Sequence, residues 1–442
     1  MFTNRPAMKK DTYTPVRMGQ TKTSELESDF IIIRDGVQQK LLANNNNDDS
    51  MDSEQLGTMI EGCFNQVLED EKILYNHATK SQMLEWVIAD IIGYGPIEPL
   101  LNDPEITEIM INGFDKVFVE RFGIIERTSV KFETDANLMR VIDRIVSPIG
   151  RRVDETSPMV DARLPNGYRV NATIPPLSLD GPILTIRKFA TLPFTIQDLI
   201  ANSTLTVALA NFLKCCVQAR INLVISGGTG TGKTTFLNVL SSFIPDRERV
   251  ITIEDTAELQ LHQVHVVRLE KRPPNVEGKG EITIRQLVIN ALRMRPDRIV
   301  MGECRGSEAL DMLQAMNTGH DGSMTTIHSN SPRDALRRIE TMVLMAGMEL
   351  PLKAIREQVA SSVEMIIHLE RMKDGTRKIV KVSEVQGMES DTIVMQDIFV
   401  FNQIGIENGI VQGSLKPTGL RPQFMHKMKE NSIEIPDSIF EK

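Results

Sequence analysis

The sequence predicts an α/β protein in which a parallel, doubly wound sheet follows a smaller α+β region and a short helical segment. Beyond about residue 205, short apolar runs alternate with helical stretches, which is typical of buried parallel strands joined by helices. Earlier, residues 107–132 alternate between apolar and polar side chains, as half-buried strands do. The length of 442 residues exceeds what one ordinary core supports, so two or three domains are expected.

The composition excludes several classes of protein. The formal net charge of −9 argues against a general nucleic-acid binder, which would carry a basic surplus. Hydrophobic residues make up 41% of the chain, enough to build cores. No apolar run approaches the roughly 18 residues that span a bilayer, and no apolar stretch near the N-terminus is typical of a signal peptide. The four cysteines form no CxxC pair, so neither a disulfide scaffold nor a zinc site is indicated. We therefore expect a cytoplasmic protein.

Residues 1–52 are expected to form a disordered tail, because they include an Asn-rich run at 44–47 and show no apolar period. Residues 1–22 carry five Lys or Arg and one Asp. Such a segment is either a solvated tail or a contact with an acidic membrane surface. A helical segment is predicted for 53–92, where apolar pairs recur at helical spacing. The glycines and proline of residues 93–96 end it.

An α+β N-terminal domain is expected at 93–190. Thr134 can cap a helix whose apolar face is formed by five residues: Leu138, Val141, Ile142, Ile145 and Val146. The turn Pro165-Asn166-Gly167 joins two predicted strands, and a third strand covers 182–189. A linker at 191–204 then leads to the second domain at 205–442.

One glycine-rich loop matches the pattern G-x-x-x-x-G-K-[ST] at every position, between an apolar strand at 221–225 and a helical stretch. Its glycines let successive N–H groups point at phosphate oxygens, and the helix N-terminus adds positive potential. The alternative is a structural turn, but the strand-loop-helix context favours a nucleoside triphosphate, with ATP as the expected ligand. The residues expected to bind it are Gly228, Thr229, Gly230, Thr231, Gly232, Lys233, Thr234 and Thr235. In this pattern Lys233 reaches the β- and γ-phosphates and the Thr234 hydroxyl ligates Mg²⁺.

Polar residues follow three other predicted strands. Ligand groups in a doubly wound sheet lie past the carboxyl ends of the strands. Glu254 and Asp255 follow one strand, Glu303 follows the next, and His328 ends a third. Because adjacent strand residues face opposite ways, one of Glu254 and Asp255 is expected to face the nucleotide. Singly, each carboxylate could equally be a helix cap or a surface group. His320, in a glycine-rich run before His328, is either a ligand-facing residue or a plain loop residue.

Four stretches resemble the signature boxes of the type II/type IV secretion ATPase superfamily: GGTGTGKTT, VITIEDTAELQL, ALRMRPDRIVMGECRG and GHDGSMTTIHSNSP. Two further stretches, RRVDETSPMVDARLPNGYRVN and AMNTGHDGSMTTIH, are similar to the CpaF type, the motor of tight-adherence (Tad/Flp, type IVc) pili. The resemblance covers about residues 55–442. It implies a cytoplasmic homohexamer at the inner face of the cytoplasmic membrane, with a RecA-like P-loop NTPase domain in each subunit. It also implies nucleotide bound between two domains, and contact with the membrane through inner-membrane platform proteins. No specific nucleic acid is implied.

The resemblance also assigns roles to individual residues. Lys233 and Thr234 match the Walker A pair, and Glu254 matches the catalytic glutamate. Glu303 occupies the Walker B position and would hold Mg²⁺ with Thr234. His328, and less directly His320, belong to the His box, which is expected near the γ-phosphate or at the interface between domains.

Three arginines and a cysteine complete these assignments. Arg169 and Arg187 match arginines of the N-terminal domain that reach the phosphates. Both alternate with apolar neighbours and so point away from the core. The alternative is that they are surface arginines. Arg305 is either an interface or a surface residue, and Cys304 places a thiol near the site.

Three functions compete. The leading hypothesis is a motor ATPase for assembly of Tad pili, with retraction left open. The alternative is an ATPase of a type IV or type II protein secretion or DNA-transfer system. A non-hydrolysing scaffold gated by nucleotide is the third, and the presence of both Glu254 and Glu303 argues against it.

Overall fold

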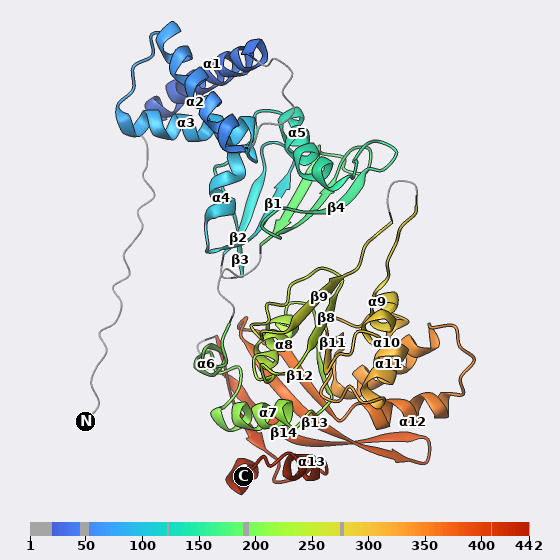
Figure 1. Cartoon of the computed structure of the whole chain (residues 1–442). Coiled ribbons are helices and arrows are strands. Elements are labelled where there is room, and N and C mark those ends of the chain that lie inside the picture. The colour runs from blue at the N-terminus through green and yellow to red at the C-terminus, as the bar shows by residue number, and fades with distance from the viewer. Residues whose placement is uncertain are drawn as a thin grey trace. The chain divides into compact units, whose positions relative to one another are not determined.

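The computed structural model describes residues 20–44, 53–121, 123–188, 194–274, 278–407 and 409–441 (Figure 1). The chain divides into two compact units, Met1–Lys188 and Phe189–Lys442. Each unit has its own hydrophobic cores, so each is described by itself.

The first unit begins with three helices that pack on one another: α1 (Gln20–Asn44), α2 (Ser53–Asp70) and α3 (His77–Ile91). The predicted tail at 1–52 is therefore wrong for residues 20–44, while residues 1–19 and 45–52 lie outside the described residues. Ile33 and Val37 of α1 are completely buried against α2 and α3. Arg34 also donates to the Glu133 carboxylate at 2.8 Å. A narrow apolar stripe on an otherwise polar helix is a weak indication of a helix in the sequence. Its burial becomes evident only from its packing against α2 and α3.

An α+β region follows, with a sheet in which every pairing is antiparallel, in the order β3-β2-β1-β6-β5-β4. Thr134 caps α5 by accepting from the Asn137 N–H, and the five residues of the predicted apolar face are buried, as predicted. The region contains η1 (Gly95–Ile97), α4 (Glu98–Asn102), β1 (Ile106–Asn112), β2 (Val117–Arg121), β3 (Ile124–Arg127), α5 (Asp135–Val146), η2 (Ser147–Ile149), β4 (Met159–Arg163), β5 (Arg169–Thr173) and β6 (Ile183–Arg187).

The second unit begins earlier than predicted. Thr195 forms a capping box with Asp198, and Leu199 of α6 (Ile196–Ala201) is buried in the core of this unit. The part of the predicted linker from 194 to 204 thus belongs to the second unit, because its apolar side chains pack there. Residues 189–193 lie outside the described residues.

A nine-stranded sheet forms the centre of this unit, in the order β15-β14-β13-β12-β7-β11-β10-β8-β9. The six strands from β12 to β9 are parallel, as the sequence predicts, and three antiparallel strands extend one edge. The strands are β7 (Leu223–Gly227), β8 (Val250–Glu254), β9 (Val266–Glu270), β10 (Arg298–Met301), β11 (Met324–His328), β12 (Met365–Arg371), β13 (Arg377–Glu389), β14 (Thr392–Glu407) and β15 (Ile410–Pro417).

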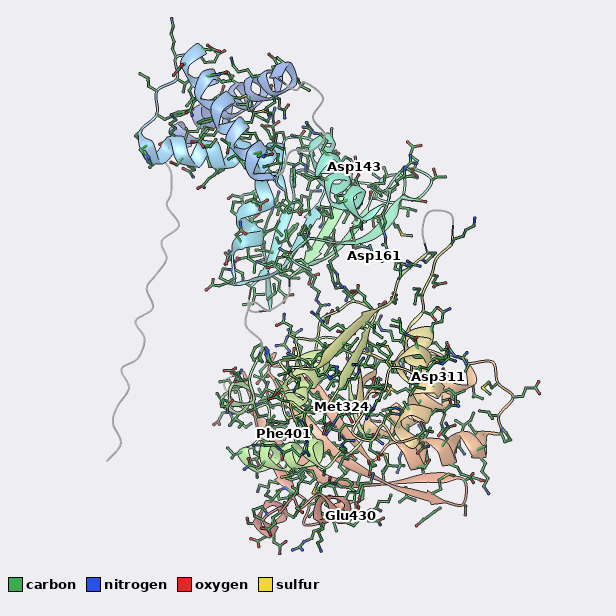
Figure 2. The ribbon with its side chains drawn as sticks, viewed as in Figure 1. Asp143, Asp161, Asp311, Met324, Phe401 and Glu430 are labelled. Atoms are coloured by element: carbon green, nitrogen blue, oxygen red, sulfur yellow. The ribbon has the colours of Figure 1, made fainter. Side chains whose placement is uncertain are left out.

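Helices cover both faces of the sheet (Figure 1). One core contains side chains of α7 and α8, and the other contains side chains of α9 to α12. Met324 of β11 is buried between these layers, whereas Glu430 of α13 is exposed at the margin (Figure 2). The helices are α7 (Val207–Gln218), α8 (Lys233–Ser241), α9 (Ile284–Ala291), α10 (Glu308–Asn317), α11 (Pro332–Leu344), α12 (Leu352–Ser362), α13 (Met425–Glu430) and η3 (Asp437–Phe440). The predicted α/β class, with an α+β region and a helical segment before it, is confirmed.

Candidate functional site

The glycine-rich loop lies between β7 and α8, as predicted. All five residues of β7 are buried, and Gly232 precedes α8 with a left-handed φ of 88° that favours glycine. At Gly227 a β-carbon would lie 2.5 Å from the Leu369 carbonyl oxygen, so only glycine fits beside β12. Thr229 and Gly230 at the tip are exposed. The sequence thus builds a tight turn whose outer surface is open to a ligand.

Lys233 lies over this loop. Its ammonium donates to the Gly228 carbonyl at 2.7 Å, and the Thr231 hydroxyl donates to the same oxygen at 3.0 Å. Burial lowers the pKa of Lys233, and the nearby carboxylate of Glu303 opposes that shift. Thr234 is half-buried in the first turn of α8 and Thr235 is exposed. The loop therefore presents a cation and a hydroxyl close to its N–H groups, as phosphate binding requires.

The parallel register brings the strand-end residues to the same edge of the sheet. His328 at the end of β11 pairs directly with Gly227, where the loop begins. β10 and β8 lie next in the sheet, and Glu303 and Glu254 lie at their carboxyl ends. Three of the predicted residues thus share this edge with the loop.

Glu254 is almost completely buried, with 2% of its surface exposed. Its Oε2 accepts from the backbone N–H groups of Glu258 and Leu259 at 2.7 and 2.9 Å. Its Oε1 has no hydrogen-bond partner among the described residues. Burial raises the pKa of this carboxyl to about 7, against the lowering effect of the two N–H donors. Glu254 therefore combines a fixed orientation with one unused acceptor and a pKa suited to proton transfer near neutrality.

Asp255 differs from Glu254 because it already has cationic partners. It forms an ion pair with Lys271 and lies 3.6 Å from the Arg305 guanidinium. Arg305 also pairs with Glu303 at 2.6 Å, and the hydrogen bond that it donates to Glu303 raises the pKa of Arg305. This arrangement favours Glu254, not Asp255, as the residue that faces a ligand. It also gives Arg305 a partner within its own unit.

The oxygen donors at this edge fit a magnesium ion. Mg²⁺ prefers one or two protein oxygens together with nucleotide phosphates. The Thr234 hydroxyl and the half-exposed Glu303 carboxylate are oxygen donors of this kind. The residues that the structure describes contain no cluster of three or more His, Cys, Asp or Glu that would hold a metal by itself.

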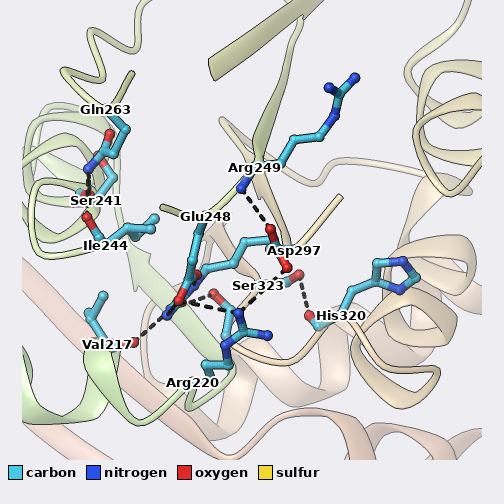
Figure 3. Close-up of polar contacts among 12 residues, drawn as sticks. Val217, Arg220, Ser241, Ile244, Glu248, Arg249, Gln263, Asp297, His320 and Ser323 are labelled. Carbon is cyan, nitrogen blue, oxygen red and sulfur yellow. Dashed lines mark hydrogen bonds and ion pairs between the residues drawn. The ribbon is translucent and has the colours of Figure 1, made fainter. Parts of the chain in front are cut away.

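The structure also bears on the expectations for His320 and Cys304. His320 precedes β11, so it lies at the opposite edge of the sheet from the loop, where its carbonyl accepts from the Ser323 hydroxyl at 2.7 Å (Figure 3). Of the two alternatives for His320, this position favours the plain loop residue. Cys304 is 2% exposed, and burial raises its thiol pKa well above the usual value. Its thiol is consequently inert and not an oxidisable group at the site.

Arg169 and Arg187 lie in the first unit, where they are direct cross-strand partners on β5 and β6. Their neighbours Val170 and Ile186 are buried, so both arginines lie on the other face of the sheet, as predicted. Arg187 is exposed and stands opposite Glu108 of β1.

Sequence reasoning missed a further neighbour of the loop. Arg377, at the start of β13, donates from Nε to the Gly230 carbonyl at 3.0 Å. The available signal was a pair of arginines on either side of a short turn at 371–377. Its relevance depends on the pairing of β12 with β7, which is not visible in the local sequence.

This geometry defines an ATP-hydrolysing P-loop protein. The family described as "Type II/IV secretion system protein" matches residues 91–409, and residues 30–92 match "Type II secretion system protein E, N-terminal domain". The chain belongs to the type II/IV secretion ATPase family, and its second unit is the RecA-like ATPase domain of that family. Among the described residues, no helix has the length and apolar character needed to span a bilayer.

Several relatives carry names from DNA transfer and secretion. A putative conjugal transfer protein of Mycobacterium tuberculosis is 34% identical over 329 residues, covering 73% of this chain and 91% of that protein. The conjugal transfer protein TrbB of Rhizobium radiobacter is 33% identical over 298 residues, covering 66% and 87%. The type IV secretion system protein VirB11 of Brucella suis is 32% identical over 318 residues, covering 66% and 88%. The pilus retraction motor PilT with bound ADP has a similar fold, with a TM-score of 0.50 and 17% identity over 76% of this chain and 86% of that one.

Proposed function

We propose that this chain is the ATP-driven motor of a type IV secretion system of the conjugal-transfer kind. The observation that carries the proposal is the buried Glu254, whose unused oxygen lies at the same sheet edge as a complete phosphate loop. The names of the relatives support DNA transfer or secretion more directly than they support pilus assembly.

In the proposed reaction the loop N–H groups and Lys233 bind the β- and γ-phosphates. Glu254 orients the attacking water through Oε1 and accepts its proton, since its Oε2 is fixed by two N–H donors. His328, adjacent to Gly227, lies where the γ-phosphate is expected. The charge that develops on the phosphate oxygens is stabilised by donors that are already oriented.

Thr234 and Glu303 would hold Mg²⁺. When bound, the ion neutralises charge on the phosphates. Glu303 keeps its position through the hydrogen bond from the Arg305 guanidinium, so this arginine acts as a positioning residue.

Arg169 and Arg187 supply the coupling between units in this proposal. A guanidinium that reaches a bound phosphate adds charge-assisted hydrogen bonds only while the two units are closed on the nucleotide. ATP would then favour closure, and loss of the γ-phosphate would relax it. The family resemblance supports a homohexamer located at the inner face of the cytoplasmic membrane, acting on inner-membrane platform proteins, with no specific nucleic acid bound by the chain itself.

The second candidate is the CpaF-type motor of Tad pili. The stretch at 151–171, RRVDETSPMVDARLPNGYRVN, favours it because of its similarity to that type. The two candidates share the reaction and differ in the machine that uses it.

Deletion of the gene, with complementation by the wild-type and Lys233→Ala chains, tests these alternatives. Loss of DNA transfer or protein secretion with intact surface pili, restored only by the wild-type chain, is expected. Loss of pili with normal transfer and secretion would favour the pilus motor instead. If neither activity changes, the chain is not the motor of either machine.

A further inference from the structure

A pair of arginines closes the hairpin formed by β12 and β13. Arg371 is the last residue of β12, Arg377 is the first residue of β13, and the two are direct cross-strand partners. Both side chains are exposed. Their cross-strand pairing places two guanidinium groups on the same side of the hairpin, at its end.

This hairpin end borders the phosphate loop within the same unit. Arg377 Nε donates to the Gly230 carbonyl at 3.0 Å, and Arg377 Cδ lies 3.3 Å from where a β-carbon of Gly232 would be. Arg371 is also close, with one guanidinium nitrogen 3.9 Å from the corresponding position at Gly230. Both arginines therefore lie beside the loop tip, and Arg377 fixes the orientation of one of its peptide groups.

The charges of this pair are not balanced by an acid. Within the described ranges, neither Arg371 nor Arg377 forms an ion pair with a carboxylate. The nearby turn residue Asp374 accepts instead from Thr376 and from the Val411 N–H at 2.8 Å. Like charges opposite one another destabilise a hairpin. A ligand with phosphate oxygens would remove that cost and gain charge-assisted hydrogen bonds.

The strand order indicates which part of a nucleotide the pair would contact. β12 lies on one side of β7, whereas β11 and β10, which lead to His328 and Glu303, lie on the other. Glu303 acts electrostatically on Lys233, so the γ-phosphate end of the loop is the Glu303 side. Arg371 and Arg377 border the opposite end, where the α-phosphate and the nucleoside leave the loop.

We infer that Arg371 and Arg377 bind the α-phosphate and nucleoside end of the nucleotide, and do so in ATP and ADP alike. The inference rests on the proposed nucleotide site. A contact that is the same with ATP and with ADP stabilises the substrate, transition-state and product complexes equally. Its loss therefore changes KM and ADP affinity more than kcat. Arg169 and Arg187, assigned to the γ-phosphate end, should behave in the opposite way.

The test is calorimetric titration of the full chain with Mg-ADP, combined with steady-state phosphate release. Arg371→Ala is the main variant, because Arg371 makes no contact that holds the loop. Arg377→Lys keeps the charge but loses the planar fork. Arg247→Ala, an exposed arginine at the other edge of the sheet, is the matched control. For Arg371→Ala we expect ADP affinity to fall by about 10-fold and KM for ATP to rise by a similar factor. Both changes would follow from the loss of one charge-assisted hydrogen bond to the nucleotide. The control should match the wild type.

The outcomes are distinguishable. If the wild-type chain binds ADP and Arg371→Ala binds it equally well, the arginine pair is not part of the site and the inference fails. A fall in kcat with unchanged ADP affinity would also overturn it, by placing the pair at the γ-phosphate. If the wild-type chain itself binds no ADP, the proposed nucleotide site fails, independently of the arginines.

Discussion

The two edges of the nine-stranded sheet hold their charged groups in different ways. At the amino edge Arg298, completely buried, pairs with Glu248 and donates to the Val217 carbonyl at 2.7 Å. Arg220 pairs with Glu248 and Asp297, and Asp297 also accepts from the Arg249 N–H at 2.8 Å (Figure 3). At the carboxyl edge Glu254 keeps one buried oxygen without a partner. Buried charges normally have partners, so this unused carboxylate oxygen is available to a ligand, although Arg249 Nε and His320 Nδ1 at the amino edge also lack hydrogen-bond partners among the described residues.

Packing differs between the amino edge and the tip of the phosphate loop. At Gly322, on the amino edge, a β-carbon would lie 2.5 Å from the Arg298 guanidinium, and the Gly322 N–H donates to the Asn222 side chain. At the carboxyl edge the tip of the phosphate loop is exposed. Substitutions at the amino edge should therefore reduce stability, and substitutions at the carboxyl edge should reduce activity.

Of the variants outside the phosphate loop, Glu254→Gln is expected to have the largest effect. Loss of the group that orients water should lower kcat by about 10²–10⁴-fold. The thermal midpoint should not fall, because the amide avoids a buried charge. Since burial raises the pKa of Glu254 to about 7, the stability contributed by the protonated carboxyl is lost as pH rises through 7. The variant should thus gain stability over the wild type above pH 7. If Asp255→Asn were the inactive variant and Glu254→Gln were active, Asp255 and not Glu254 would be the residue that faces the nucleotide.

Arg298→Met tests the amino edge. It leaves Glu248 buried next to Arg220 alone, and removal of one partner of a buried pair costs about 3–5 kcal/mol. Urea unfolding should show this loss, while the ADP affinity of the folded protein stays near that of the wild type. The double variant Arg298→Met/Glu248→Leu should recover part of the stability. Full stability of the single variant would show that the network is not structural.

His368 sharpens the comparison because it is a buried group at the carboxyl edge whose Nδ1 has a partner, whereas its Nε2 has no hydrogen-bond partner among the described residues. Its Nδ1 lies 2.8 Å from the Ser226 hydroxyl, and burial lowers its pKa from 6.5 to about 4. A lowered pKa contributes stability that is present above pH 6.5 and is lost as pH falls through 4. Wild-type stability should therefore drop by about 2–3 kcal/mol between pH 7.5 and 4.5 from this group. Unfolding of His368→Gln should lack that part of the pH dependence, and identical profiles would contradict the assignment.

The smallest of these effects is expected for Arg187→Ala. Turnover should fall by at least about 10-fold, which corresponds to 1.4 kcal/mol of lost transition-state stabilisation. The thermal midpoint should hardly change, because an exposed side chain contributes little to the core. Arg169→Ala should lower turnover by a similar factor. Normal hydrolysis by both variants would show that they are surface arginines.

The parts of the site that could be predicted from the sequence are those marked by short local motifs. The phosphate loop, Glu254, Glu303 and His328 each follow an apolar strand, and parallel strands bring their carboxyl ends to one edge. His320 differs from these residues because it precedes its strand, which places it at the other edge.

Features that depend on distant pairing could not be predicted. Arg377 reaches the loop because β12 pairs with β7, which lies about 140 residues earlier in the chain. The antiparallel extension by β13 to β15 depends on the same long-range pairing. Helix α1 could not be predicted from its own sequence, because Ile33 and Val37 are recognisable as core residues only from their packing against α2 and α3.

Phosphate release at saturating Mg-ATP by the wild-type chain and by Lys233→Ala tests the central claim most directly. Lys233 supplies the cation of the loop, and its removal leaves the paired charges at the amino edge untouched. We predict turnover by the wild type, no measurable turnover by the variant, and equal thermal midpoints without nucleotide. Turnover of Lys233→Ala near the wild-type rate would contradict the account, because hydrolysis would then occur elsewhere than at the carboxyl edge of this sheet.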